Sequence, residues 1–243
     1  MLRVGRIDYA NCTPLFMQLE SALPAIDAEV VHGVPAELND LLARGKIDLC
    51  ISSSVEFCRH AAEDLVLPGN CIGSCWAVKS VLLLTDRPAE QLGGAQLLVS
   101  SESATSVVLL QILLTERWGL SGYTVERSSL PMSEALQQAP GLLLIGDKAL
   151  QAAAAASAPY CYDLGEEWLR LTGLPFVYAL WLLNRHSGSG KEDAVRQFCR
   201  LLAQARDRIV PDAALLAARA PEAGWIGAAS LADYWRNAIT YTL

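Results

Sequence analysis

The chain has 243 residues, of which 52% are hydrophobic and 19% charged, and its net charge is −7. This hydrophobic content indicates a compact globular protein and excludes a disordered one. The acidic balance, without a basic stripe, argues against nucleic-acid binding, which depends on clustered Lys and Arg.

The first quarter of the chain alternates short β patterns with helical patterns. Gly45 closes one helical pattern as a typical C-cap, and apolar runs with β-branched ends are typical of buried strands. The sequence predicts strands at Arg3–Tyr9, Ala28–Gly33 and Ile47–Ile51, and helices at Leu15–Ala22, Val34–Arg44 and Val55–Ala62. This rhythm predicts a mainly parallel sheet with both faces covered.

A longer β-rich segment, Cys71–Thr85, separates this region from a second alternating region. A second β-rich run covers Leu174–Asn184, and Glu192–Leu243 reads as helices broken at Pro211 and Pro221. Between the two runs the sequence predicts strands at Gln96–Val99, Thr124–Ser128, Leu142–Ile145 and Tyr160–Leu164, and helices at Ser103–Trp118, Ser133–Gln138 and Lys148–Ser157.

Two similar halves, two crossings and a helical tail predict a two-lobed α/β fold. This arrangement resembles the periplasmic-binding-protein-like fold of the second type, with parallel or mixed sheets flanked by helices. We expect lobe I to contain residues 1–83 and 178–243, and lobe II to contain residues 84–177. A ligand would bind in the cleft between the lobes, at strand C-termini and helix N-termini, and hinge closure would follow.

Polar clusters occur where predicted strands give way to helices. Asn11 lies between the first strand and the first helix, and its amide can both donate and accept a hydrogen bond. Ser52, Ser53 and Ser54 follow a buried strand and could bind an anion or a hydroxyl group with the adjoining helix terminus. Ordinary turn or capping roles are an alternative at both places.

A third cluster, Ser100–Ser106, opens a long apolar helix in the second half. We place it at the position equivalent to Ser52–Ser54, so that each lobe would offer one carboxylate-binding helix end. The members expected to bind substrate are Ser103, Ala104, Thr105 and Ser106.

Two further candidates come from a strand end and from the first crossing. Gly146 and Asp147 follow a buried strand, and Asp147 could be a base, a hydroxyl acceptor or a helix N-cap. Trp76–Val81 lies on the first crossing strand, where alternation places Ser80 on the face of Val78 and Trp76, so that Ser80 could contact the ligand.

The seven cysteines indicate a reducing compartment and no metal site. Their odd number and mostly apolar neighbours favour buried thiols over disulfides. Cys71 and Cys75 lack the two further ligands that zinc needs. With no visible secretion signal and no apolar stretch long enough to cross a bilayer, we expect a cytoplasmic protein that does not enter membranes.

The ordered set of motifs resembles the chorismate dehydratases of the futalosine route to menaquinone. The resemblance spans about the first three quarters of the chain, and Phe57 stands where Tyr is more usual in that family. Its residues are Gly5–Pro14, Asp48–Phe57, Lys79–Val81, Ser103–Ser106, Ile145–Leu150, Tyr162–Gly165 and Trp168–Trp181.

The resemblance implies a hydro-lyase that converts chorismate to 3-[(1-carboxyvinyl)oxy]benzoate, with no cofactor. It also implies that Asn11 and Ser80 line the site, and we expect these two to be the catalytic residues. From their places at strand and helix ends, we expect Ser53, Ser54 and the later polar clusters to bind substrate. Either a substrate carboxylate or Asp147 could take the ring proton. The alternatives are a 1,4-dihydroxy-6-naphthoate synthase-like enzyme of the same pathway and a non-catalytic solute-binding protein for a small carboxylate. The oligomeric state stays open between monomer and homodimer.

Overall fold

A computed structural model describes residues 1–155 and 157–243, which form two compact units. Unit 1 contains residues 1–73 and 177–243, and unit 2 contains residues 74–176. The second boundary between the units lies after residue 176, one position before the expected boundary after residue 177. The first break lies earlier than the expected one after residue 83, because strand β5 (Val81–Thr85) belongs to the sheet of unit 2.

Unit 1 is built on a mixed sheet of order β2-β1-β3-β10-β4. The central strand β1 pairs in parallel with β2 and β3, and β10 runs antiparallel to β3. Every residue of β3 is buried, as expected for a strand covered on both faces. The strands are β1 (Leu2–Ile7), β2 (Ala28–Gly33), β3 (Leu49–Ser53), β4 (Asp64–Ser74) and β10 (Phe176–Asn184).

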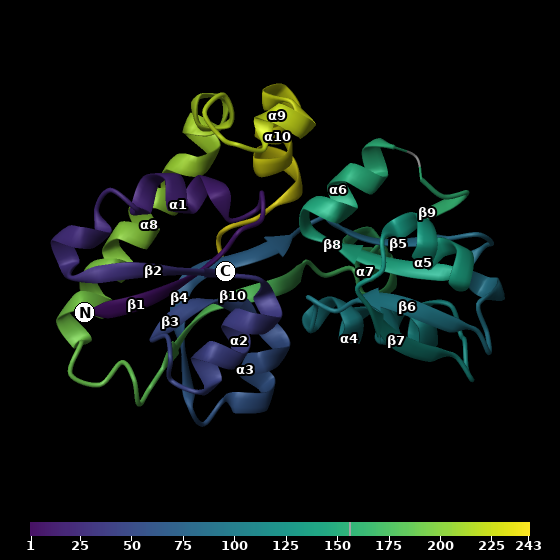
Figure 1. Cartoon of the computed structure of the whole chain (residues 1–243), viewed down its shortest axis with the longest axis horizontal. Coiled ribbons are helices and arrows are strands. Elements are labelled where there is room, and N and C mark those ends of the chain that lie inside the picture. Colours follow the sequence, from purple (N-terminus) through teal and green to yellow (C-terminus); the bar gives the residue numbers. More distant parts are fainter. Residues whose placement is uncertain (156) are drawn as a thin grey trace. The chain divides into compact units, whose positions relative to one another are not determined.

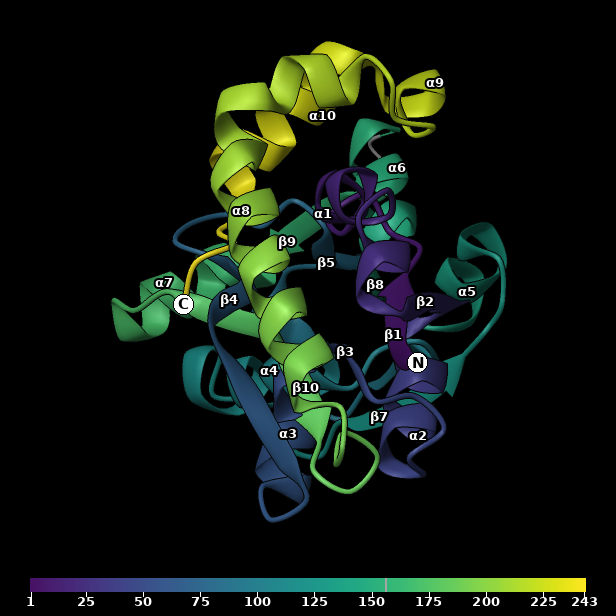
Figure 2. The ribbon, with the colours of Figure 1, turned by 90° about the vertical axis from the view of Figure 1, so that its left-hand side faces the viewer.

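Helices cover both faces of this sheet. Helices α1 and α8 pack against each other on one face, while α2 and α3 lie on the other (Figure 1). Figure 2 shows the long α8 running beside α1. The helical segments are α1 (Thr13–Leu19), η1 (Leu23–Ile26), α2 (Pro35–Ala43), α3 (Ser54–His60), α8 (Glu192–Ala217), α9 (Ala223–Ile226), α10 (Ala228–Asp233) and η4 (Tyr234–Ala238).

Unit 2 repeats the same plan with the sheet order β7-β6-β8-β5-β9. Strand β6 pairs in parallel with β7 and β8, and β5 runs antiparallel to β8 and β9. The strands are β5, β6 (Gln96–Ser100), β7 (Thr124–Ser128), β8 (Gly141–Ile145) and β9 (Tyr160–Asp163). The helical segments are η2 (Ala89–Gln91), α4 (Thr105–Ile112), η3 (Leu113–Arg117), α5 (Met132–Gln138), α6 (Gly146–Ala154) and α7 (Leu164–Thr172).

The period-two pattern of the leucines sets the core of unit 2. Leu82 and Leu84 of β5 and Leu142 and Leu144 of β8 point to one face, where they pack with buried alanines of α5 and α6. Leu83 and Leu143 point to the other face and are also fully buried. Both faces of this sheet are therefore covered, as the uninterrupted apolar runs predict.

Most predicted elements are present, with shifts at their ends, but two expectations are wrong, one helix was not predicted, and one predicted helix begins earlier than expected. Residues 75–80 do not form a crossing strand, and Lys79 has a φ of 62°, so the alternation argument for Ser80 does not hold. Helix α7 was not predicted. Pro211 lies inside α8, where its exposed position lets water reach the carbonyl that lacks an N–H partner. The helix expected at Lys148–Ser157 is α6, which begins at Gly146, and residue 156 lies outside the described part.

Within residues 1–155 and 157–243, no helix is long and apolar enough to cross a membrane. All seven cysteines are free. Cys50 is fully buried, and burial raises the pKa of its thiol far above the usual value. The expectation of buried thiols is wrong for Cys58, Cys75 and Cys161, which are exposed.

A buried carboxylate ties three segments of unit 1 together. The fully buried side chain of Asp48 accepts hydrogen bonds from the Arg3 backbone N–H at 2.7 Å, the Arg3 guanidinium at 2.9 Å and the Lys191 ammonium at 2.7 Å. Burial raises the pKa of Asp48, but the hydrogen bonds from Arg3 and Lys191 outweigh it and hold the pKa below its usual range. Asp48 thus joins β1 to the start of β3 and to the start of α8.

We predict that Asp48→Asn lowers the free energy of unfolding by about 3 kcal/mol at neutral pH, because it breaks a buried ion pair. The folded-state pKa is depressed, so the stabilisation is present above the unfolded-state value of about 3.9 and is lost as the pH falls through the folded-state value. Urea unfolding of both proteins across the acid range measures this difference. Asp193→Asn, at an exposed ion pair with Arg196, is the matched control and should change little. A wild-type advantage that persists undiminished in acid would contradict the prediction.

Candidate functional site

Parallel pairing brings two predicted clusters of unit 1 to one edge of its sheet. Asn11 lies in the loop between β1 and α1, while Ser53 and Ser54 lie where β3 gives way to α3. Because β1 and β3 are parallel neighbours, the loops that follow them leave the sheet at the same edge. The prediction that both clusters lie at strand-to-helix junctions is therefore confirmed.

The loop that carries Asn11 is held by the C-terminal tail. The hydroxyl of Tyr241 donates to the backbone carbonyl of Asn11 at 2.9 Å, and the indole N–H of Trp235 donates to the carbonyl of Ala10 at 2.7 Å. The hydroxyl of Thr13 donates to the buried carboxylate of Glu222 at 2.5 Å. We call Glu222, Trp235 and Tyr241 the tail clamp. It fixes the backbone on both sides of Asn11.

Burial keeps the Tyr241 hydroxyl protonated and therefore a donor. Burial raises the pKa of Tyr241 well above its usual value, and Tyr234 and Cys12 raise it further. The side chain is only 5% exposed, so water cannot readily replace its bond to Asn11. The Tyr241 hydroxyl therefore stays a donor to the Asn11 carbonyl at neutral pH.

The side chain of Asn11 has an unused acceptor. Its Oδ1 atom is buried, and no donor reaches it from any residue that the structure describes. Buried polar atoms are nearly always hydrogen-bonded, so such an atom indicates a place for a ligand or water. Asn11 can accept through this oxygen and can donate through its amide NH₂ group.

The serine cluster after β3 is partly used within the protein. The hydroxyl of Ser52 donates to Asn39 Oδ1 at 2.7 Å, and the hydroxyl of Ser54 donates to the carbonyl of Val177 at 2.8 Å. Ser53 is the N-cap residue of α3 but makes no side-chain cap, and it is 8% exposed. Ser53 is therefore better placed than Ser54 to offer its hydroxyl to a ligand.

The candidates of unit 2 also gather at one sheet edge. Strand β5 is antiparallel to β8, so Ser80, which precedes β5, lies beside Gly146, which follows β8. The Gly146 N–H donates to the Ser80 carbonyl at 2.8 Å. Strand β6 is the other neighbour of β8, and its C-terminal loop, Ser101–Ala104, leaves at the same edge. The structure thus brings together Ser80, Gly146 and the Ser103–Ser106 cluster.

The strand orders correct the expected equivalence between the two halves. Aligning β2-β1-β3-β10 with β7-β6-β8-β5 makes β6 the counterpart of β1 and β8 the counterpart of β3. The Ser100–Ser106 cluster therefore corresponds to the loop of Asn11, not to Ser52–Ser54. Gly146 and Asp147 correspond to Ser53 and Ser54. The sequence argument failed because hydroxyl-rich clusters look alike, whereas strand order is a tertiary property.

The N-terminus of α4 has the features of an anion site. Ser103, Thr105 and Ser106 are buried, and Ala104 at the N-cap provides no side-chain cap. Arg127 donates to the carbonyls of Ser101 and Ser103, at 3.0 and 2.9 Å, and so holds the turn that leads into α4. Backbone N–H groups at such a terminus favour a bound carboxylate.

Asp147 is not the N-cap of α6. The N-cap residue is Ile145, and Asp147 lies in the first turn, where its negative charge favours the helix through the macrodipole. The next residue, Lys148, forms an ion pair with Glu102 at 2.8 Å, which links the start of α6 to the loop after β6. The half-buried Asp147 remains a candidate base by position alone.

The turn that carries Ser80 is held by Asp163. Asp163 Oδ1 accepts from the Val78 N–H at 3.0 Å, and Oδ2 accepts from the Lys79 N–H at 2.6 Å. Oδ1 also caps α7 by accepting from the N–H groups of Gly165 and Glu166. Burial raises the pKa of Asp163, and these four backbone N–H groups oppose the rise.

Sequence reasoning missed both supports of the candidate residues. For Asp163 a signal existed, because an Asp followed by two acidic residues in the next turn is typical of a helix start. For the tail clamp no signal existed, since Glu222, Trp235 and Tyr241 lie more than 200 positions from the loop they hold. Within the described residues no group of His, Cys, Asp and Glu could hold a metal ion.

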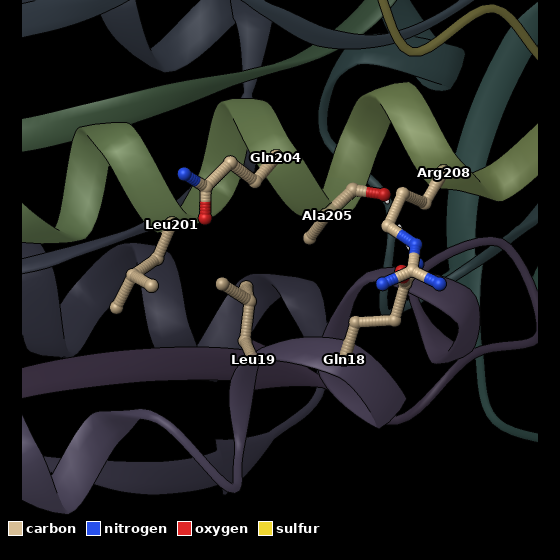
Figure 3. Close-up of a pocket in the computed structure, with 6 residues that line it drawn as sticks. All are labelled: Gln18, Leu19, Leu201, Gln204, Ala205 and Arg208. Carbon is tan, nitrogen blue, oxygen red and sulfur yellow. Dashed lines mark hydrogen bonds between the residues drawn. The ribbon is translucent and has the colours of Figure 1, made fainter.

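A groove between α1 and α8 lies apart from these residues. Its lining side chains come from the C-terminal part of α1 and the middle of α8 (Figure 3): Gln18, Leu19, Leu201, Gln204, Ala205 and Arg208. Gln18 bridges the two helices by donating to the carbonyls of Pro14 and Ala205, both at 3.0 Å. The groove contains none of the candidate residues.

We predict that Tyr241→Phe lowers the free energy of unfolding by about 1–2 kcal/mol, because the buried carbonyl of Asn11 loses its donor. Urea or thermal unfolding measures the change. Tyr123→Phe is the matched control, since it removes a hydroxyl that donates to the Gln111 carbonyl at an exposed position. The control should change stability by less than about 0.5 kcal/mol. Equal losses in the two variants would argue against the tail clamp.

Solved structures of low sequence identity share the fold of this chain. The alkanesulfonate-binding protein SsuA from Xanthomonas axonopodis pv. citri has a TM-score of 0.70 at 19% identity, covering 98% of this chain and 86% of that one. A Candida albicans protein with the generic periplasmic binding protein fold has a TM-score of 0.71 at 10% identity, covering 99% and 81%. The chain therefore has the expected periplasmic-binding-protein-like fold.

Two relatives of known activity are similar in sequence. A chorismate dehydratase of Thermus thermophilus is 35% identical over 201 residues, which are 76% of this chain and 70% of the relative. A chorismate dehydratase of Campylobacter jejuni is 30% identical over 179 residues, 72% of this chain and 64% of the relative. A family model described as menaquinone biosynthesis matches residues 2–243. The chain therefore belongs to this menaquinone-biosynthesis family.

Proposed function

We propose that this chain is a chorismate dehydratase, which converts chorismate to 3-[(1-carboxyvinyl)oxy]benzoate and water on the futalosine route to menaquinone. The observation that carries the proposal is the 35% identity to the Thermus thermophilus chorismate dehydratase over 201 residues. The buried, unpartnered Oδ1 of Asn11 supports it, because this acceptor can receive a hydrogen bond from the ring hydroxyl group of chorismate.

The reaction needs little help from the protein. Chorismate loses the hydrogen on the ring carbon that bears the ether, and the neighbouring carbon loses its hydroxyl group, so one water leaves. The two electrons of the broken C–H bond complete the aromatic ring, which makes the reaction strongly downhill. The enzyme must therefore bind and orient a dianion, and must assist proton loss and hydroxide departure.

Neutral hydrogen-bonding groups fit this task. We assign the catalytic roles to Asn11 and Ser80, with Asn11 orienting the carboxylate of the substrate or assisting the leaving hydroxyl group. The base is a carboxylate of the substrate itself, tethered close to the ring proton. Intramolecular delivery of this kind can lower a barrier by several kcal/mol, on the order of 7–11 at best.

Substrate binding uses the helix ends at the two sheet edges. In unit 2, the buried hydroxyls of Ser103, Thr105 and Ser106 and the backbone at Ala104 suit a carboxylate. In unit 1, Ser53 offers a further hydroxyl, while Ser54 is tied to Val177. Gly146 and Asp147 complete the proposed binding set. Local donors of this kind can bind an anion although the chain is acidic overall.

Three further parts of the proposal concern the surroundings of the enzyme. We place it in the cytoplasm, since seven free cysteines suit a reducing compartment. We expect it to work without a cofactor, because the dehydration changes no oxidation state overall. A monomer and a homodimer are both compatible with the proposed reaction, since each chain carries its own copy of the catalytic residues.

The deciding experiment mixes the purified protein with chorismate, without added metal or cofactor, and follows the product by mass. We predict the loss of one water at a rate that is proportional to enzyme concentration. Thermal stabilisation by chorismate without turnover would instead favour a solute-binding protein. Absence of both effects would move the assignment to the naphthoate-forming enzyme of the same pathway.

Two variants separate the candidate bases. We predict that Asn11→Ala lowers kcat about 10²- to 10³-fold, a typical effect of removing one preorganised hydrogen-bonding group. Asp147→Asn should keep most of the activity, because the substrate supplies the base. If Asp147→Asn is inactive while Asn11→Ala still turns over chorismate, the substrate-assisted mechanism is wrong and Asp147 is the base.

A further inference from the structure

Asp163 connects two parts of unit 2 that lie about eighty positions apart in sequence. Through Oδ1 it caps α7, and through both oxygens it binds the backbone of the turn before β5. Its contacts with this turn are 3.0 Å to the Val78 N–H and 2.6 Å to the Lys79 N–H. A capping residue needs only the hydrogen bonds to the N–H groups of its own helix. The two hydrogen bonds to Val78 and Lys79 therefore indicate an additional role.

The turn held by Asp163 places Ser80. The hydroxyl of Ser80 donates to the carbonyl of Val78 at 3.4 Å, and the Ser80 carbonyl accepts from the Gly146 N–H at 2.8 Å. Ser80 is 2% exposed, so few alternative positions are open to its side chain. Because the Ser80 hydroxyl is bonded to the Val78 carbonyl, a shift of the Val78 backbone would change the position of that hydroxyl.

The backbone of this turn is in an unfavourable conformation that needs support. Lys79 has a φ of 62°, in the left-handed region that costs free energy for every residue with a Cβ atom. Such conformations persist where surrounding contacts over-determine them, and they often occur at functional sites. The shortest of the four Asp163 hydrogen bonds goes to the N–H of Lys79 itself.

We propose that Asp163 is a positioning residue that fixes Ser80 through the backbone of Val78 and Lys79. The proposal rests on the proposed function, since it takes Ser80 to act on the substrate. Asp163 does not itself contact the reacting atoms. It acts by holding the turn in the one conformation that presents the Ser80 hydroxyl correctly.

The key variant is Asp163→Ser, because serine is a good N-cap but is too short to reach Val78 and Lys79 as well. We expect α7 to stay folded and kcat to fall about 10- to 100-fold, as for a small displacement of a reacting group. KM should change far less than kcat. Asp163→Asn tests the Lys79 bond more narrowly, since its NH₂ group would face the Lys79 N–H.

The control variant is Glu166→Gln, which removes a negative charge from the same first turn. The Glu166 side chain pairs with Arg170 at 2.6 Å, within α7 itself. Its kcat should stay within about twofold of the wild type, because partly exposed pairs contribute little. A loss as large as that of Asp163→Ser would show a general charge effect and overturn the proposal.

A double-mutant comparison identifies the route of action. If Asp163 acts through Ser80, then Asp163→Ser combined with Ser80→Ala should be no slower than Ser80→Ala alone. Losses that multiply would mean that Asp163 affects activity by a different route, and the proposal would fail.

Rescue at Lys79 tests the conformational part of the argument. Glycine adopts a positive φ without cost, so Lys79→Gly should restore part of the kcat lost in Asp163→Ser. Lys79→Ala is the matched control, since it removes the same side chain but keeps the Cβ atom, and it should not restore activity. Equal effects of the two substitutions would contradict the conformational role.

Hydrogen exchange separates failure of this proposal from failure of the proposed function. In Asp163→Ser the amides of residues 78–80 should exchange faster, while those of α7 beyond its first turn should keep their protection. This readout needs no substrate. A wild-type protein inactive on chorismate would refute the proposed function, whereas unchanged exchange at residues 78–80 would refute the positioning role.

Discussion

Parallel pairing of the central strands is the constraint on which the candidate site depends. In each unit a parallel trio, β2-β1-β3 or β7-β6-β8, directs every following loop to the same edge of the sheet. Residues that are far apart in sequence, such as Asn11 and Ser53, then share one edge without any direct bond between them. The antiparallel neighbours β10 and β5 bring a strand start to that edge, which is how Ser80 comes to lie beside Gly146.

Sheet topology alone leaves these loops free to move, and polar contacts from distant segments restrict them. The tail clamp holds the Asn11 loop through two backbone carbonyls and the Thr13 hydroxyl. Asp163 holds the Ser80 turn through two backbone N–H groups. In both cases buried or half-buried side chains from a distant segment hydrogen-bond to backbone atoms of the loop. Such bonds fix the backbone conformation of the loop. Preorganisation of this kind suits catalysis by neutral groups, whose effect depends on placement.

The same fold occurs in the alkanesulfonate-binding protein SsuA and in the Candida albicans protein, each with less than 20% identity to this chain. A shared fold does not by itself specify whether a ligand is only bound or is also converted. Under the proposed function, the chemistry depends on the candidate side chains at the sheet edges, which are mainly amide and hydroxyl groups. Such groups can orient a dianion without the charge that a lysine or arginine would add.

The sequence by itself determined the α/β class, the order of most elements, the fold family and the positions of Asn11, Ser53 and the Ser103–Ser106 cluster. Local patterns sufficed because hydrophobic periodicity and strand-to-helix junctions are local properties. Only the tertiary structure decided that Ser100–Ser106 corresponds to the Asn11 loop, that residues 75–80 form a turn with Lys79 at positive φ, and that Asp163 binds this turn. It also decided the role of the tail. These features depend on strand order and on contacts between residues tens to hundreds of positions apart, and no local pattern encodes such contacts.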